Sequence, residues 1–235
     1  MKKWLREILF FNEPCRDRWV AQQASLIVAG ARVLDVGAGS CPYRPLFAHC
    51  DYRAHDFEKL KPAQLRGKGV YGQLDFVGDI CSIAVDDGSF DVILCTEVLE
   101  HVPEPIKALK EFARILKPGG RIILSAPLGS GLHQEPFHFY GGYTPHWYRR
   151  FLAEAGFGDI LVEPNGGFFS YFGQECMRFV VLMAPWNGWA RLVWLPVWCL
   201  GLPWCVTVPL FAKIWDKLDQ GKIFTVGYHV TATRR

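Results

Sequence analysis

The segment Val33–Ser40, with the sequence VLDVGAGS, constrains the fold more than any other part of the chain. In it an apolar strand runs directly into a turn with two glycines, Gly37 and Gly39, which lets the backbone approach a ligand closely where the next helix begins. Short apolar segments alternate with longer segments of helical pattern, and this predicts an α/β fold with a parallel sheet covered on both faces. The expected strands are Arg32–Val36, Tyr52–Asp56, Phe90–Cys95 and Arg121–Ala126.

Two helices are predicted beside these strands. The first begins at Pro105 and ends before Pro118-Gly119-Gly120, with an apolar stripe of Ile106, Leu109, Ala113 and Leu116. The second follows Thr144-Pro145, and its inward residues are expected to be Trp147, Phe151, Leu152 and Ala155.

Composition excludes several classes of protein. The formal net charge is +3 over 235 residues, so the chain has no global basic footprint and we expect no nucleic-acid partner. Its eight cysteines fall at irregular intervals without metal-ligand spacing, so we expect reduced thiols and no metal site. In residues 1–11 charged Arg6 and Glu7 interrupt the apolar run, which does not fit a secretory signal, and the expected location is the cytoplasm.

The turn itself discriminates between ligands. A dinucleotide-binding turn would carry a third glycine where this chain has Pro42. Asp35 would face the phosphates of a dinucleotide, but it could accept a hydrogen bond from an ammonium group. The pattern therefore favours a zwitterionic amino acid over a diphosphate, and an NAD-dependent Rossmann oxidoreductase is the less favoured alternative.

On these residues Val33–Ser40 resembles the first motif of class I S-adenosylmethionine-dependent methyltransferases, and the following motifs agree with the type 11-like subgroup. Asp56 follows Gly37 by 19 residues, and the later motifs are Asp79-Ile80, Ser89–Ile93, Glu97–Val102 and Leu116–Gly120. The resemblance covers roughly residues 32–157. It implies a Rossmann-like sandwich with a mostly parallel seven-stranded sheet whose last strand is antiparallel.

The resemblance also implies how S-adenosylmethionine is bound as the cofactor. Asp56 would take the ribose hydroxyls, Asp79 the adenine amino group, and Ile80 would cover the adenine ring. The turn after the fourth strand would meet the methionine part. The implied cofactor-binding residues are Asp35, Gly37, Ala38, Gly39, Ser40, Asp56, Phe57, Asp79, Ile80, Thr96, Glu97 and Val98.

Methyl transfer is an in-line displacement that depends on positioning, and a hydroxyl acceptor must also lose a proton. The candidate catalytic bases are His101, His133 and His138. The segment His133–Tyr140 follows the fifth strand and is expected to bind the acceptor. The alternatives are a structural anchor for His101 and a packed aromatic loop for residues 133–140.

An apolar stretch, residues 179–212, contains one charged residue, Arg191, and Leu192–Ala212 contains none. Because a predicted closing strand follows it, the stretch would have to enter and leave a membrane on one side as a hairpin. Its prolines favour a broken path, and its tryptophans and flanking basic residues suit a headgroup boundary. We expect an apolar helical insertion before the last strand, in peripheral or monotopic contact with the inner face of the membrane. The alternatives are a cover over the domain and a homodimer face.

Four segments are therefore expected. They are an N-terminal helical segment (1–30), a methyltransferase core (31–178), an apolar, membrane-associated insertion (179–215) and a closing strand (216–235). The expected activity is methyl transfer to a small-molecule or lipid-like acceptor. A methyltransferase-like binding protein without turnover is the second alternative.

Overall fold

The computed structural model describes residues 11–67, 69–184 and 188–235, with the backbone but not the side chains of residues 189–191. The described chain forms two compact units. The larger contains residues 18–163 and 227–235, and the smaller contains residues 11–17 and 164–226. The first ten residues of the predicted N-terminal helical segment lie outside the described residues, as do Trp186 and the side chains of Trp189 and Arg191. The division into four segments stays a prediction.

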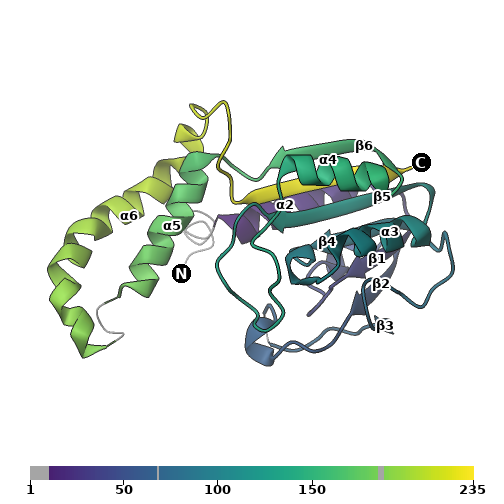
Figure 1. The fold of residues 1–235 in the computed structure, drawn as a ribbon, viewed down its shortest axis with the longest axis horizontal. Helices are drawn as coiled ribbons and strands as arrows, with labels where there is room; N and C mark the ends of the chain where they lie inside the picture. Colours follow the sequence, from purple (N-terminus) through teal and green to yellow (C-terminus); the bar gives the residue numbers. More distant parts are fainter. Residues whose placement is uncertain (1–10, 68, 185–187) are drawn as a thin grey trace. The chain divides into compact units, whose positions relative to one another are not determined.

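Seven strands form one sheet in the order β3-β2-β1-β4-β5-β7-β6 (Figure 1). The strands are β1 (Arg32–Val36), β2 (Asp51–Asp56), β3 (Phe76–Val77), β4 (Phe90–Thr96), β5 (Leu116–Pro127), β6 (Phe157–Pro164) and β7 (Gly227–Arg234). The pairs from β3 to β5 are parallel, and β7 runs antiparallel to β5. The mostly parallel sheet with an antiparallel last strand is confirmed, and so is the α/β class.

The central strand β1 shows why this sequence forms a buried parallel sheet. Val33, Leu34 and Val36 are each fully buried, so both faces of the strand are covered. Leu34 is paired with Arg53 of β2 on one side and with Ile93 of β4 on the other. This continuous apolar run fixes the position of the glycine turn that follows.

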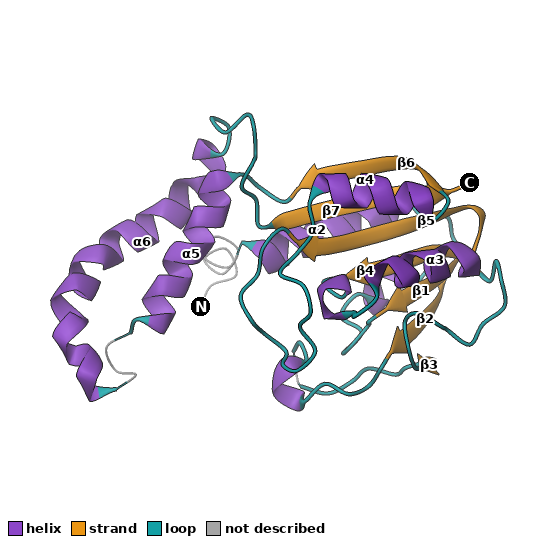
Figure 2. Ribbon diagram, in the orientation of Figure 1, coloured by secondary structure: helices purple, strands orange, loops and turns teal. Residues whose placement is uncertain are grey.

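Helices cover both faces of the sheet (Figure 2). One face packs against α3 (Pro105–Ile115) and α4 (Pro145–Glu154), with Leu109, Phe112 and Leu152 in its core. The other packs against α2 (Asn12–Ser25), whose Trp19 stacks on His229 of β7 with ring centroids 4.4 Å apart. Burial of each large apolar side chain contributes about 1.5–3 kcal/mol. The short 3-10 helices are η1 (Arg44–Phe47), η2 (Pro62–Gln64) and η3 (Leu99–His101).

Two details of the helices differ from the sequence prediction. Helix α3 ends at Ile115, so Leu116 begins β5. The buried helix face also contains Ala108 and Phe112, which were not predicted, whereas Ile106 and Ala113 are only partly buried. In α4 the fully buried residues are Tyr148 and Leu152, of which Tyr148 was not predicted. The start of α4 is as predicted, because Thr144 Oγ1 accepts a hydrogen bond from Trp147 N at 3.3 Å.

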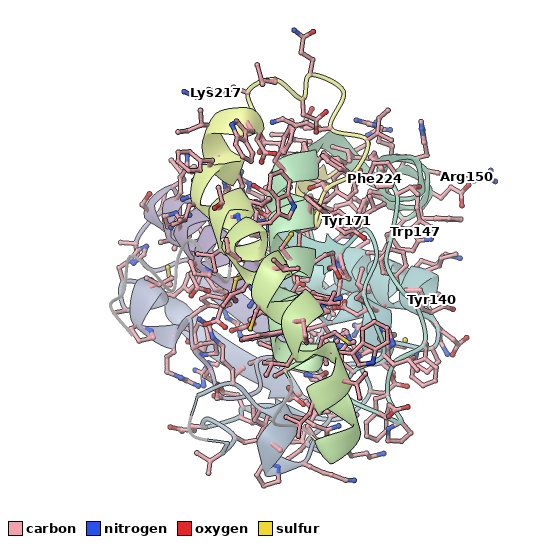
Figure 3. The ribbon with its side chains drawn as sticks, turned by 90° about the vertical axis from the view of Figure 1, so that its left-hand side faces the viewer. Tyr140, Trp147, Arg150, Tyr171, Lys217 and Phe224 are labelled. Carbon is pink, nitrogen blue, oxygen red and sulfur yellow. The ribbon has the colours of Figure 1, made fainter. Side chains whose placement is uncertain are left out.

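The smaller unit is a helical hairpin. Its helices are α5 (Phe168–Leu182) and α6 (Leu195–Trp215), joined through the 3-10 helix η5 (Trp189–Trp194). Cys176, Cys205 and Val208 form its small buried core. Near its base Tyr171 and Phe224 stack with ring centroids 6.2 Å apart (Figure 3). The apolar helical insertion before the last strand is therefore present.

Asp216 fastens the base of this hairpin. Its carboxylate accepts hydrogen bonds from Gly167 N, Phe169 N and Ser170 N at 2.9–3.1 Å, and also from Ser170 Oγ. The acceptor thus comes from the segment after α6 and satisfies the first free N–H groups of α5. One side chain ties the two ends of the hairpin together.

Candidate active site

The predicted cofactor residues all lie at the carboxyl ends of four adjacent strands. Asp35 lies one residue before the end of β1, where the glycine turn begins, and Asp56 and Phe57 lie at the end of β2. Asp79 and Ile80 follow β3, Thr96 ends β4, and Glu97 and Val98 follow it. Because β3, β2, β1 and β4 are parallel neighbours, their carboxyl ends meet at one edge of the sheet. This is the edge where open α/β sheets bind ligands.

The turn after β1 is held against β2 and requires glycine. Gly37 N and Ala38 N both donate hydrogen bonds to His55 O, at 2.8 and 3.0 Å. Gly37 has φ +72°, and a Cβ atom there would lie 2.4 Å from Val98 Cγ2. Both the backbone conformation and the contact with Val98 therefore exclude a larger residue.

Asp56 ties the glycine turn to the end of β2. Its Oδ2 accepts a hydrogen bond from Gly39 N at 2.9 Å, and its Oδ1 accepts one from Glu58 N at 3.1 Å. The residue is buried, and burial raises the pKa of its carboxyl. The ring of Phe57, next in the chain, packs edge-on against Phe137 of the loop after β5 at a centroid distance of 5.0 Å.

Asp35 is the second buried carboxyl beside the turn. Tyr52 Oη donates a hydrogen bond to its Oδ2 at 2.5 Å. Burial raises the pKa of Asp35 to about 7, although the Tyr52 hydrogen bond acts in the opposite direction. A carboxyl of this kind changes charge near neutral pH, and a cation beside it would favour the ionised form.

Asp79 and Asp75 have different surroundings. Asp75 accepts hydrogen bonds from Ala54 N at 2.9 Å and Arg53 Nη1 at 3.1 Å, so it holds the sheet together. Asp79 is exposed, and its Oδ1 accepts a hydrogen bond from Cys81 N at 2.9 Å. Asp79, with half-buried Ile80 next to it, is therefore an accessible carboxylate at this end of the sheet.

The turn after β4 has an unusual backbone. Glu97 adopts φ +53°, a conformation uncommon for a residue with a side chain and often found at functional sites. Ser125 Oγ donates a hydrogen bond to Glu97 Oε1 at 2.8 Å, and Glu97 N donates to Ser125 O at 2.8 Å. These contacts with β5 hold Thr96 and Val98 in place on either side, and Val98 faces Gly37.

The three predicted histidines lie together. Ring centroids are 4.8 Å apart for His101 and His133, 4.5 Å for His133 and His138, and 5.6 Å for His101 and His138. His101 comes from η3, and the other two come from the loop after β5. The loop is fastened to η3, because Phe139 N and Tyr140 N both donate to Glu100 O at 3.0 and 3.1 Å.

The surroundings of His101 and His138 favour neutral imidazoles. Burial lowers the pKa of His101 to about 4. Desolvation also lowers the pKa of His138, whose Nε2 lies 3.1 Å from Ser130 Oγ. Uncharged imidazoles at neutral pH are able to accept a proton or to bind a cation.

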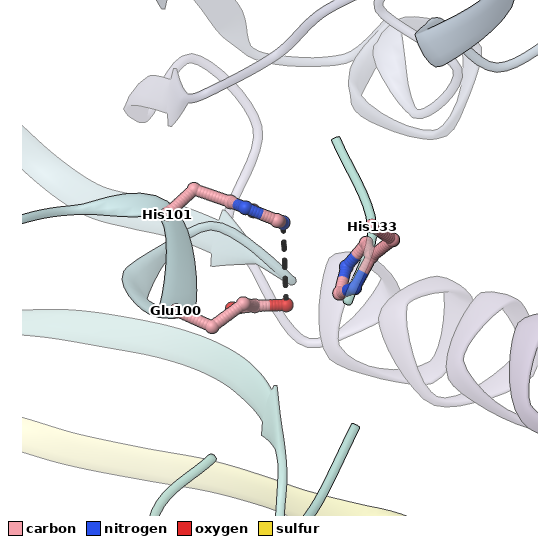
Figure 4. A group of neighbouring side chains, drawn as sticks. All are labelled: Glu100, His101 and His133. Atoms are coloured by element: carbon pink, nitrogen blue, oxygen red, sulfur yellow. Dashed lines mark ion pairs between the residues drawn. The ribbon is translucent and has the colours of Figure 1, made fainter. Parts of the chain in front are cut away.

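Glu100 is a member of this cluster that sequence reasoning did not select. Its side chain is 1% exposed, and its Oε1 lies 3.8 Å from His101 Nε2 (Figure 4). Glu100, His101 and His133 each offer a ligand atom, and these atoms all lie within 4.8 Å of one another. No metal site was predicted from the sequence, because the chain lacks regular metal-ligand spacing and His133 lies 32 residues beyond His101. The adjacent pair Glu100-His101 at a strand end was the available signal.

Comparison with known proteins identifies the family of the central segment. Residues 34–124 match the protein family described as "Methyltransferase domain". The resemblance to class I methyltransferases is therefore confirmed for this segment.

Proteins named ubiquinone biosynthesis O-methyltransferase are similar to it. The protein of Xanthomonas oryzae pv. oryzae is 42% identical over 108 residues, 43% of this chain and 45% of the relative. That of Xanthomonas campestris pv. campestris is 38% identical over 118 residues, 48% of each chain. The chain thus matches about half the length of these relatives.

Solved structures share the fold. Phosphoethanolamine N-methyltransferase 2 of Haemonchus contortus, in complex with S-adenosyl-L-methionine, is similar with a TM-score of 0.53 and 16% identity. That similarity covers 94% of this chain and 52% of the other. The [4+2]-cyclase SpnF has a TM-score of 0.53 and 20% identity over 94% of this chain and 80% of its own. At these identities the similarity concerns the fold alone.

Proposed function

We propose that the protein transfers a methyl group from S-adenosylmethionine to a small-molecule acceptor, because residues 34–124 match the family described as "Methyltransferase domain". The observation that carries the proposal is the glycine turn flanked by two buried carboxyls, Asp35 and Asp56. A turn that excludes side chains and lies beside acidic groups fits a cationic amino-acid nucleoside better than a pyrophosphate.

Each residue at this edge has a distinct role in the proposal. Asp35 accepts a hydrogen bond from the α-ammonium group, and Asp56 from the ribose hydroxyls. Asp79 binds the adenine amino group, and the turn Thr96–Val98 contacts the methionine part. When bound, S-adenosylmethionine supplies an electrophilic methyl carbon on a positively charged sulfur. The residues orient it and exclude water, and positioning alone can supply up to about 7–11 kcal/mol of rate acceleration.

The histidine cluster supports a hydroxyl acceptor. An oxygen nucleophile loses its proton during methyl transfer, and neutral imidazoles accept protons. His101, His133 and His138 gather at the carboxyl edges of β4 and β5, next to the proposed cofactor turn. The curated relatives are named O-methyltransferases, which agrees with oxygen as the acceptor atom.

The hairpin supports membrane contact, which we include in the proposal. The helical stretch Leu192–Trp215, which contains the end of η5 and all of α6, is long and apolar enough to span a bilayer. In its most apolar 18 residues only 22% is buried. The most exposed apolar side chains near its start are Val193 at 79% and Leu200 at 81%. The helix is the second arm of a hairpin, so we propose insertion from one side into the interface and not a crossing. A lipid-like acceptor at the inner face of the membrane is the substrate class that suits this attachment.

The charges of the hairpin agree with this orientation. Asp216, Lys217 and Asp219 lie at its base, and no charged residue occurs between Leu192 and Ala212. Trp194 and Trp204 are 54% and 57% exposed, and exposed tryptophan is typical of the headgroup region. A homodimer through the same apolar surface is the competing outcome.

Calorimetry and labelled methyl transfer test the enzymatic proposal. The purified chain is expected to bind S-adenosylmethionine, and Asp56→Asn is expected to weaken binding at least about tenfold because a charged hydrogen-bond acceptor is lost. Asp51→Asn, at the opposite end of β2, is the control and should bind normally. Heat with NADH and none with S-adenosylmethionine would overturn the proposal.

A second measurement separates an enzyme from a binding protein. The chain is incubated with methyl-labelled S-adenosylmethionine and either lipid or polar-metabolite extract. We expect S-adenosylhomocysteine to form only when an acceptor is present, with the label in the product. Cofactor binding with no product in either extract would favour a protein without turnover, and the shared fold of a [4+2]-cyclase makes this control necessary.

A further inference from the structure

We propose that Glu100, His101 and His133 bind a divalent transition-metal ion that holds the acceptor oxygen. This inference rests on the proposed function, since it assigns a role to side chains of the same site. Its starting point is the group of three ligand atoms that lie within 4.8 Å of one another (Figure 4).

Backbone contacts orient both histidines for a metal. His101 Nδ1 lies 2.6 Å from Phe137 O, and His133 Nδ1 lies 2.9 Å from Gly131 O. A carbonyl oxygen can only accept, so each Nδ1 must carry the ring proton and donate it. Each Nε2 is then the unprotonated atom, which is the form that binds metals, and this carbonyl support is the usual arrangement around metal-bound histidine.

The third ligand is a carboxylate in the interior. Glu100 is 1% exposed, and its Oε1 faces His101 Nε2 at 3.8 Å. A cation between the imidazoles would lie against this buried negative charge and offset its desolvation. Metal bonds of about 2.0–2.2 Å would bring the ligand atoms to roughly 3.3 Å of one another, so binding would draw these side chains inward.

The ligand types indicate the ion. Two imidazoles and one carboxylate suit Zn²⁺ and its transition-metal neighbours, whereas Mg²⁺ and Ca²⁺ prefer a set of oxygen ligands. Three protein ligands leave a coordination position for an outside oxygen. In this chain that position is available to the hydroxyl of the acceptor.

With the ion bound, His101 and His133 would be ligands and His138 would be the base. A hydroxyl bound to a divalent ion loses its proton near neutral pH. His138 is outside the ligand set, with its ring 4.5 Å from that of His133, and it takes the proton. The O–H bond breaks to His138, the oxygen forms a bond to the methyl carbon, and the bond from that carbon to sulfur breaks with its electron pair going to sulfur.

Cobalt titration of the full chain tests the site without relying on activity. Metal is removed with a chelator, and Co²⁺ is added while visible absorption is recorded, because Co²⁺ in a site with few ligands absorbs strongly. We expect a band that saturates at a single ion per chain and disappears when Zn²⁺ is added. His133→Ala and Glu100→Gln should each weaken Co²⁺ binding about 10- to 100-fold.

Matched controls keep the outcome interpretable. His146→Ala removes an exposed imidazole from α4 and should leave the titration unchanged. Calorimetry with S-adenosylmethionine checks that each variant is folded. No band in the wild type, or equal Co²⁺ affinity in a folded His133→Ala variant, would overturn the metal site.

The two proposals fail in different ways. Co²⁺ binding with no affinity for S-adenosylmethionine would remove the proposed function and leave the metal site standing. Undiminished methyl transfer by the chelated enzyme, with no Co²⁺ band, would remove the metal site and leave the methyltransferase.

Discussion

The Tyr52 hydroxyl and the Asp35 carboxyl form a 2.5 Å hydrogen bond beneath the glycine turn. Both side chains lie on one face of the sheet, because Asp35 of β1 is paired with Ala54 and Tyr52 lies two residues earlier on β2. The pair holds an acidic group in the protein interior, away from water, beside the proposed cofactor site. The stability of the fold, and the way that stability changes with pH, both depend on that group.

Asp35→Asn should change how stability depends on pH. The pKa of Asp35 is about 7 in the folded chain against an ordinary 3.8, so folding favours its protonated form. Its contribution is fully present below pH 3.8 and is lost as the pH rises through 7, by up to about 4 kcal/mol. Urea unfolding without cofactor, from pH 5 to pH 8.5, should show Asp35→Asn gaining stability relative to the wild type. The exposed Asp86→Asn variant is the control, and parallel curves for Asp35→Asn and the wild type would contradict the prediction.

Gly37→Ala should destabilise the fold more than Gly30→Ala. Both glycines have positive φ, +72° and +79°, so alanine costs about 1–2 kcal/mol at either position. At Gly37 the new Cβ would also lie 2.4 Å from Val98 Cγ2, whereas nothing lies within 4 Å at Gly30. We expect a total loss of about 3 kcal/mol or more at Gly37, measured by urea unfolding, together with loss of S-adenosylmethionine binding. If the two variants lose equal free energy of unfolding, the Val98 side chain can move away from the new Cβ without strain.

Asp216→Ala should loosen the start of α5. The substitution removes the carboxylate that accepts three hydrogen bonds from backbone N–H groups, and it leaves the hydroxyl of Ser170, which is 2% exposed, without this partner. We expect local stability to fall by about 2–3 kcal/mol. Hydrogen exchange at residues 168–172 measures this directly, with Lys217→Ala as the neighbouring surface control. Unchanged protection in Asp216→Ala would show that packing alone fixes the helix start.

Leu200→Asp should weaken attachment to membranes. Leu200 is 81% exposed on α6, and an aspartate in an inserted segment is strongly disfavoured. In flotation with vesicles containing anionic lipid, we expect binding to fall about tenfold or more. Leu26→Asp changes an exposed leucine of the larger unit and should bind like the wild type. A wild-type chain that forms dimers and does not float would favour the homodimer interpretation.

The parts of the fold that sequence predicts well depend on local patterns. Strand β1 was predicted at its observed bounds, because a short apolar run ends at glycines that can adopt positive φ. The stripe on α3 was extended one residue past the end of the helix, because Leu116 is apolar enough to continue the pattern although it belongs to β5. Periodicity cannot distinguish a last helical residue from a first strand residue when both are buried.

The candidate site shows where local patterns stop being informative. The three histidines were each selected because imidazole is reactive, but their proximity depends on the path of the loop after β5. That path is set by hydrogen bonds from Phe139 N and Tyr140 N to Glu100 O, between segments almost 40 residues apart. Glu100 was therefore missed as a partner, because its place next to His101 in the chain does not show that its side chain is buried and faces the imidazole.

The position of β7 between β5 and β6 has a consequence for synthesis. In the described sheet β6 is the edge strand and its neighbour is β7, and residues 165–226 lie between the two strands in the chain. At about 5–20 residues per second, a ribosome needs roughly 3–12 s to add that segment. During this interval β5 is an open edge, while the hairpin is already emerging and free to meet its surroundings. Completion of the sheet thus waits for the segment that is proposed to attach the protein to the membrane.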